Sequence, residues 1–287
     1  MKTKILTLLI LPLLVWVNLS IWNYLNYPLK MQSWDKVMKG VTYSPMRRDF
    51  DPGNSSPPTQ DQIENDLKLL AGKVHAVRTY SALDGLEFVP ELADKYDLNV
   101  TMGAWIDTDL DKNRREIESL IELSNQNSPT IVRLLVGNEV LLRKDIAPDQ
   151  LIDYIREMKA RTWRPVSTSE TWDMWLAHPE LAEEVDFIAL HILPYWEGLS
   201  IDAAVDYVFY RFNAMREAFP DKPMIITEVG WPSDGQPFKN ATASLANQAQ
   251  FLRQFLNRAT EQKITYYVIE AFDQPWKVEL EGSAGAY

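Results

Sequence analysis

The sequence contains no cysteine, which excludes disulfide bonds, thiolate metal sites and a cysteine nucleophile. Its three histidines leave few ligands for a metal centre, and only His191 lies near the end of an expected strand. Runs rich in lysine and arginine are also missing, and the formal net charge is −11. Nucleic acid and anionic membrane surfaces are therefore disfavoured as main partners, and we expect no metal or other cofactor.

The N-terminus is the one place where apolar residues form a long run. Lys2 and Lys4 precede an apolar stretch that extends from Ile5 to about Tyr24. A bilayer-spanning helix needs about 20 apolar residues. We therefore expect residues 1–30 to form a transmembrane anchor, with the rest of the chain in the periplasm or cell envelope. A cleaved signal peptide is the alternative interpretation.

Residues 36–287 alternate between apolar segments typical of strands and segments with helical spacing. This alternation indicates parallel strands joined by helices, and about eight such units predict a closed (β/α)8 TIM barrel. An open doubly wound sheet would carry a glycine-rich phosphate turn after its first strand, and no such turn is present. The eight expected strands begin near Gly40, Ala76, Asn99, Thr130, Arg164, Asp186, Pro223 and Thr265.

Local signals support some of the expected helices. Thr59 and Gln62 have the spacing of a capping box, and Pro148 suits the first turn of a helix. The last expected strand ends near Trp276, which leaves about a dozen residues for a closing helix and its loop. Either the chain is truncated at its C-terminus or the barrel closes in a nonstandard way.

Two glutamates follow expected strands where a barrel builds its active site. Glu139 ends the fourth strand and Glu228 ends the seventh, so both are expected to lean into the mouth of the barrel. Two converging carboxyl groups are what cleavage of a glycosidic bond requires. Strict alternation would place Arg133 on the same face as Glu139, and a bulge at Gly137 would resolve this conflict. A structural role for each glutamate, in an ion pair or a loop, is the alternative.

Polar and aromatic residues surround this pair in the predicted fold. Arg78 can keep a carboxylate ionised, and Tyr195 could hydrogen-bond Glu228. Tryptophans at or beyond strand ends can stack on the apolar faces of sugar rings, and we expect this of two among Trp105, Trp196, Trp231 and Trp276. The predicted substrate-binding residues are Tyr43, Arg78, Tyr80, Trp105, Asn138, Tyr195, Trp231, Glu270, Trp276 and Lys277. A Schiff-base enzyme would need a lysine in the mouth, and Lys277 is its one candidate.

Several motifs together resemble glycoside hydrolase family 17, which includes β-1,3-glucanases and bacterial β-glucan glucanosyltransferases. In chain order they are GVTYSP, VRTYS, GNEV, HILPYW, ITEVGWPS and EAFDQPWK. The resemblance implies a retaining mechanism with a covalent glucosyl-enzyme intermediate, in which Glu228 is the nucleophile and Glu139 the acid/base. It also implies that Asn138 binds a sugar hydroxyl and that Glu270, Lys277 and Glu281 line the cleft. Gln274 stands where the plant enzymes commonly have an acidic residue.

The expected function is that of a membrane-anchored enzyme that cleaves β-1,3-glucan and passes the fragment to water or to another sugar. The membrane-spanning start favours transfer, as in bacterial relatives that remodel envelope glucans. Two alternatives remain open at this point: a catalytically silent glucan-binding module, and a partner domain of a larger membrane glucan synthase.

Overall fold

The computed structural model describes residues 12–22, 34–48, 50–51, 56–126 and 129–287. The chain divides into two units, Met1–Ser33 and Trp34–Tyr287. In the first unit residues 12–22 are helical, and the rest of the expected N-terminal anchor lies outside the described residues. Within the described ranges, none of the helices combines the length and the apolar character that a membrane span requires.

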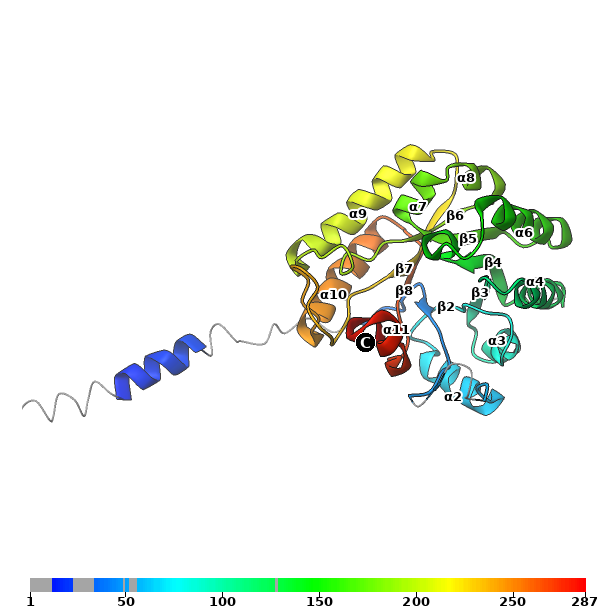
Figure 1. The fold of residues 1–287 in the computed structure, drawn as a ribbon. Helices are drawn as coiled ribbons and strands as arrows, with labels where there is room; N and C mark the ends of the chain where they lie inside the picture. Colours follow the sequence, from blue (N-terminus) through cyan, green and yellow to red (C-terminus); the bar gives the residue numbers. More distant parts are fainter. Residues whose placement is uncertain (1–11, 23–33, 49, 52–55, 127–128) are drawn as a thin grey trace, which may run out of the picture. The chain divides into compact units, whose positions relative to one another are not determined.

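In the second unit eight parallel strands form a closed barrel, so the predicted (β/α)8 fold is confirmed (Figure 1). Each strand pairs with the next in sequence, and the pairing of Val41 with Val268 closes the ring. The strands are β1 (Val41–Thr42), β2 (Ala76–Arg78), β3 (Asn99–Ala104), β4 (Ile131–Asn138), β5 (Val166–Thr171), β6 (Ile188–His191), β7 (Met224–Val229) and β8 (Tyr266–Val268).

Helices connect the strands on the outside of the barrel (Figure 1). The capping box of Thr59 and Gln62 at the start of the first of them is confirmed, as is Pro148 in a first helical turn. The helices of this unit are α2 (Gln60–Leu70), α3 (Val89–Asp94), α4 (Leu110–Asn125), α5 (Val140–Arg143), α6 (Pro148–Arg161), α7 (Trp172–Ala177), α8 (Glu180–Glu184), α9 (Ile201–Ala218), α10 (Leu245–Glu261) and α11 (Val278–Glu281).

The end of the barrel differs from the sequence-based expectation. Strand β8 ends at Val268, well before Trp276. Pro275, which has no N–H to donate to a ladder, begins a 3₁₀ turn instead, and short α11 follows. Hydrogen bonds from Gln274 N to Ala286 O and from Ser233 N to Tyr287 O hold this segment beside the residues that follow β7.

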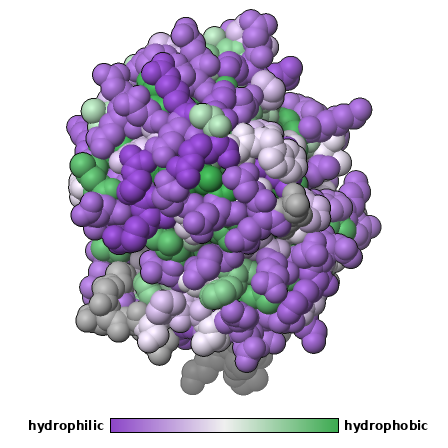
Figure 2. All heavy atoms as spheres, turned by 90° about the vertical axis from the view of Figure 1, so that its right-hand side faces the viewer, coloured by the Kyte–Doolittle hydropathy of each residue, from purple (hydrophilic) through white to green (hydrophobic). Residues whose placement is uncertain are grey.

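Apolar side chains fill both the barrel and the layer between strands and helices. In a cluster of Ala76, Leu135, Phe187, Ala189, Ile225 and Tyr267, side chains from β2, β4 and β8, which are not neighbours, meet across the barrel interior. The outer helix faces are polar, and Figure 2 shows this for the side that carries α4 and α6. The interior is therefore a packed core and not a pore.

The bulge expected at Gly137 is present in β4. The register between β4 and β5 shifts between Leu135 and Asn138, and Gly137 has a φ of +88°. The shift begins after Leu135, so Arg133 keeps its inward direction and its guanidinium lies over the ring of Phe187 in the barrel interior. Beyond the shift, Glu139 turns towards the mouth of the barrel. The bulge thus sets the direction of the residue that follows the strand.

We expect Gly137→Ala to destabilise the barrel strongly. A Cβ at this position would lie 2.3 Å from Cγ2 of Val140, and the left-handed backbone disfavours any L side chain. The left-handed conformation costs about 1–2 kcal/mol and forced overpacking adds about 1–3 kcal/mol. Urea unfolding measures the change in the free energy of unfolding.

Gly72→Ala is the matched control, because Gly72 has a φ of +72° but nothing within 4 Å of the added Cβ. Only the backbone contribution, about 1–2 kcal/mol, should be lost there. If the free energy of unfolding fell equally in the two variants, a steric clash between the added Cβ and Val140 would be contradicted.

Candidate active site

The structure brings Glu139 and Glu228 together at the carboxyl ends of the strands. Glu139 directly follows β4, and Glu228 lies near the end of β7. Three atoms lie within 4.8 Å of one another: one carboxylate oxygen of Glu139, one of Glu228 and a ring nitrogen of His191. The Glu228 side chain is 6% exposed and that of Glu139 is 22% exposed, so the two carboxyl groups share one space but differ in their access to solvent.

Arg78, at the end of β2, links Glu228 to the fourth strand. Its Nη1 donates to Oε1 of Glu228 at 2.6 Å, and its Nη2 donates to Oδ1 of Asn138. The guanidinium is only 1% exposed and lies 4.6 Å from the ring centroid of Tyr80. Arg78, Tyr80 and Asn138 therefore gather around Glu228, and side chains from β2, β4 and β7 form one network.

The surroundings of Glu228 favour its ionised form. Burial alone would raise the pKa of this carboxyl group, but the charges of His191 and Arg78, the Arg78 hydrogen bond and the charge of Lys277 lower it below its usual value. The carboxylate is thus held charged although water is almost excluded from it.

His191 belongs to the site, although sequence reasoning weighed it only as a metal ligand. It ends β6, and the register of β6 and β7 places it opposite Glu228. Its Nδ1 shares a hydrogen bond of 2.7 Å with Oε1 of Glu139, and its Nε2 lies 3.6 Å from Oε1 of Glu228. The signal that could have revealed it is its position at the end of the strand beside β7.

Three of these groups could offer ligand atoms to a cation: Glu139, His191 and Glu228. However, Nδ1 of His191 is engaged with Glu139, and the guanidinium of Arg78 occupies an oxygen of Glu228. A metal ion there would have to displace these interactions and accept a fixed positive charge beside it. The arrangement therefore suits carboxylates that act directly.

Glu270 and Lys277 form a second, nearly buried ion pair after β8. Nζ of Lys277 lies 2.9 Å from Oε2 of Glu270. Burial raises the pKa of Glu270 to about 7, against the lowering effect of Lys277. Burial likewise raises the pKa of Glu281, and the charges of Glu228 and Glu139 raise it further. These residues place a mixed set of charges along one side of the candidate site.

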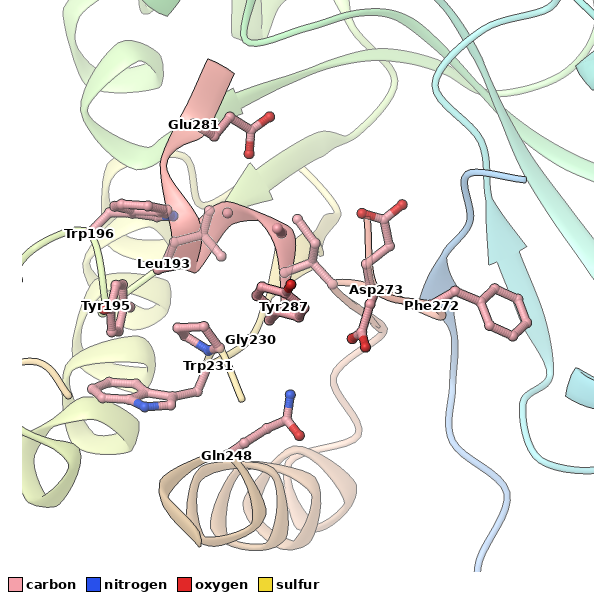
Figure 3. Close-up of a pocket in the computed structure, with 16 residues that line it drawn as sticks. Leu193, Tyr195, Trp196, Gly230, Trp231, Gln248, Phe272, Asp273, Glu281 and Tyr287 are labelled. Atoms are coloured by element: carbon pink, nitrogen blue, oxygen red, sulfur yellow. The ribbon is translucent and has the colours of Figure 1, made fainter. Parts of the chain in front are cut away.

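A pocket opens beside these groups, between the loops that follow β6, β7 and β8 (Figure 3). Glu270 and Glu281 border it, as does Trp196, which is 42% exposed. In Figure 3 the rings of Tyr195, Trp196 and Trp231 gather on one side of the pocket. The pocket thus combines carboxyl groups with aromatic side chains, which suits a ligand that has both hydroxyls and apolar faces.

Two other tryptophans, Trp105 just after β3 and Trp276 in the 3₁₀ turn beyond β8, are half-buried. Trp105 packs against the guanidinium of Arg143 at 4.4 Å, and its indole N–H donates to Asp107. Trp276 packs edge-on against Phe50, and its indole N–H donates to the side chain of Gln274. Each ring is therefore fixed in orientation by neighbours while part of its surface stays open.

Three predicted substrate-binding residues are placed differently from what direct contact with a sugar requires. Tyr43 is fully buried and donates its hydroxyl hydrogen to Asp66, because α2 covers it. Trp231 is 2% exposed and packs against Tyr195, so its ring is part of the wall and not a free platform. The hydroxyl of Tyr195 donates to the carbonyl of Gln236, and not to Glu228 as expected.

We expect Arg78→Met to destabilise the fold by about 3–5 kcal/mol at pH 7, because it leaves the buried charge of Glu228 without its partner. The lowered pKa of Glu228 means that the ion pair stabilises the fold fully above the unfolded value near 4.5. That stabilisation disappears as the pH falls through the folded value. The loss caused by the mutation should therefore shrink on acidification, which urea unfolding at pH 7 and pH 4 measures.

Arg161→Met is the control, because it breaks exposed ion pairs with Glu118 and Glu157. Exposed pairs contribute about 0–1 kcal/mol, so little change is expected at either pH. If Arg78→Met lowered the free energy of unfolding by the same amount at pH 7 and pH 4, the unpaired charge of Glu228 could not be the cause of the destabilisation.

Comparisons with known proteins agree with this geometry. Residues 40–287 match the model of the BtgE/BtgC glycoside hydrolase domain family. The chain is 31% identical over 273 residues to a putative glucan endo-1,3-beta-glucosidase btgC of Aspergillus niger, which covers 85% of this chain and 40% of that protein. It is 28% identical over 281 residues to the glucan endo-1,3-beta-glucosidase btgC of Emericella nidulans, covering 88% and 43%. The chain thus spans about two fifths of the length of these relatives.

Among solved structures, the chain is similar to a glycoside hydrolase family 17 beta-1,3-glucanosyltransferase from Rhizomucor miehei. The TM-score is 0.76 at 29% identity, with 87% of this chain and 91% of that chain covered. An active-site mutant of the Rhizomucor miehei enzyme in complex with laminaritriose gives a TM-score of 0.77 at 28% identity, with the same coverage. The resemblance to family 17 seen in the motifs is confirmed, and the chain belongs to the family of BtgE/BtgC glycoside hydrolase domains.

Proposed function

We propose that the protein is a retaining glycoside hydrolase and transglycosylase that acts on β-1,3-glucan. The observation that carries this proposal is the separation of the two carboxyl groups, with oxygens of Glu139 and Glu228 within 4.8 Å. Retaining enzymes have carboxyl groups about 5–5.5 Å apart, whereas inverting enzymes need about 6.5–9.5 Å to admit a water molecule between sugar and base.

In the first step Glu228 attacks the anomeric carbon while Glu139 donates a proton to the departing glycosidic oxygen. The carbon–oxygen bond to the leaving sugar breaks, and an ester bond between Glu228 and the sugar forms. Arg78 and His191 support this assignment, since they favour the ionised carboxylate that a nucleophile needs. The greater exposure of Glu139 suits a group that must exchange protons with its surroundings.

In the second step a hydroxyl group attacks the anomeric carbon and releases Glu228. Glu139, now a carboxylate, removes the proton from that hydroxyl group. If the hydroxyl belongs to water the result is hydrolysis, and if it belongs to a second glucan the result is transfer. We favour transfer, because Trp196 offers an exposed ring at the pocket and because the similar Rhizomucor miehei protein is a glucanosyltransferase.

The substrate follows from the relatives and from the chemistry of the pocket. The fungal relatives are glucan endo-1,3-beta-glucosidases by name, and the Rhizomucor miehei mutant is in complex with laminaritriose. A β-1,3-glucan presents the hydroxyls and apolar ring faces that carboxyl groups and tryptophans recognise.

We further propose that residues 1–30 anchor the enzyme in a membrane, with the barrel outside the cytoplasm, where it remodels envelope or periplasmic glucans. The support is the pattern of Lys2 and Lys4 before the apolar stretch of 5–24. In a membrane fraction washed with alkaline carbonate, the full chain should remain bound and the variant lacking residues 1–30 should be released. Release of the full chain by the wash would contradict the anchor.

We expect Glu228→Ala to lower turnover of laminari-oligosaccharides by about 10⁴-fold or more, because the covalent step loses its nucleophile. Glu139→Ala should lose less, about 10²–10⁴-fold, because only proton transfer is removed. Chromatography of a digest by the unaltered protein should show products longer than the substrate if transfer dominates. Exclusively shorter products would leave hydrolysis as the reaction.

Glu180→Ala is a suitable control, because this partly exposed glutamate at the start of α8 pairs with His178, which follows α7. Its turnover should equal that of the unaltered protein. Near-normal turnover by Glu228→Ala would remove the nucleophile assignment, and binding without any product by the unaltered protein would replace the enzyme with a glucan-binding module.

A further inference from the structure

A third carboxyl group near the pair has no part in the reaction described above. Glu170 lies in β5 and is 0% exposed, and its Oε1 accepts a hydrogen bond of 2.9 Å from the backbone N–H of Leu141. The backbone of Leu142 also interacts with this carboxyl group. A glutamate sealed inside a barrel is costly unless its contacts compensate, so these contacts point to a role.

The contacts of Glu170 fall on the turn that presents Glu139. Glu139 has φ 53° and ψ 35°, a left-handed conformation that is unfavourable for an L residue. Helix α5 begins directly after it, and the first N–H groups of a helix have no partner within the helix. Strand β5 supplies partners on both sides of the turn, since the carbonyl of Ser169 accepts from the N–H of Glu139 at 2.7 Å and Glu170 accepts from Leu141.

We propose that Glu170 is a positioning residue, whose carboxyl group holds the left-handed turn that aims Glu139 at the departing glycosidic oxygen. The proposal rests on the role of Glu139 as the proton donor. Main-chain hydrogen bonds at this turn fix the backbone of Glu139, from which its side chain starts. The hydrogen bond to His191 fixes the carboxyl group at the other end of that side chain. Two anchor points define a side-chain direction that one anchor alone would leave free.

The role requires a hydrogen-bond acceptor and not a charge. Burial raises the pKa of Glu170 to about 7, so the carboxyl group loses its charge readily while its oxygen still accepts from Leu141. A glutamine amide oxygen of the same length can do the same. Alanine removes the acceptor, and aspartate keeps the carboxyl group but shortens the side chain by one methylene.

The test compares Glu170→Ala and Glu170→Gln on two substrates. Laminaritriose needs a proton on its leaving oxygen, whereas a 2,4-dinitrophenyl β-laminaribioside releases a stable anion without one. For Glu170→Ala we expect kcat/KM on laminaritriose to fall by about 10²-fold, the cost of a misdirected proton donor. On the dinitrophenyl substrate the fall should be less than about 10-fold, since no proton transfer is needed to break that bond. Glu170→Gln should stay within about 5-fold of the unaltered protein on both substrates, because the acceptor is retained.

Glu116→Ala is the matched control. Glu116 is equally buried, its pKa is likewise raised by burial to about 7, and it accepts from Ser81 and from the N–H of Ala82, in a different loop. Its loss should affect both substrates alike. The supporting result is a fall in kcat/KM on laminaritriose, but not on the dinitrophenyl substrate, that occurs in Glu170→Ala and is absent in Glu170→Gln and Glu116→Ala.

Equal losses on the two substrates, or no loss, would overturn the positioning role. If Glu170→Ala does not fold, as judged by its circular dichroism, Glu170→Asp takes its place, and the same selective loss is expected because the shorter side chain cannot reach Leu141. An unaltered protein that is inactive on both substrates would refute the proposed function itself, which separates the two conclusions.

Discussion

The buried pair of Arg78 and Glu228 is the interaction on which the rest of the site depends. Two charges that are almost sealed from water would destabilise the fold if either lacked a partner. The barrel meets this requirement because parallel strands bring all their carboxyl ends to one rim, so a cation from β2 can reach an anion on β7 and an amide on β4. The same geometry that satisfies the charges also fixes the distance between Glu228 and Glu139.

The position of Glu139 depends on backbone features instead of charges. The glycine at position 137 permits the bulge, the bulge ends the regular alternation of β4, and the left-handed residue 139 then turns the chain into α5. Neighbouring β5 holds this turn through Ser169 and Glu170. The two carboxyl groups are thus fixed by different means, one by side-chain partners and the other by its main chain.

Most of the fold could be predicted from the sequence, since most strands are apolar runs between helical patterns, although β5 is mostly polar. Glu139 and Glu228 were identifiable because each lies at the end of such a run. Glu170 gave no comparable signal, because it lies within a polar strand whose neighbours decide its role. The predicted hydrogen bond from Tyr195 to Glu228 was wrong for a similar reason: hydrogen-bond partners in loops are set only where the loops meet in the folded barrel. The same holds for the burial of Trp231, which the sequence does not reveal.

The different environments of the two carboxyl groups account for the division of labour that we propose. Glu228 is surrounded by Arg78, His191 and Lys277, and almost no water reaches it, so its negative charge is favoured and little solvent competes for the sugar carbon. Glu139 has one strong partner, His191, and keeps a path to solvent. A group that must first give and then take a proton needs such a path, whereas a nucleophile does not. If the two residues exchanged environments, the donor would be held ionised and the nucleophile would be hydrated, and neither step would proceed efficiently.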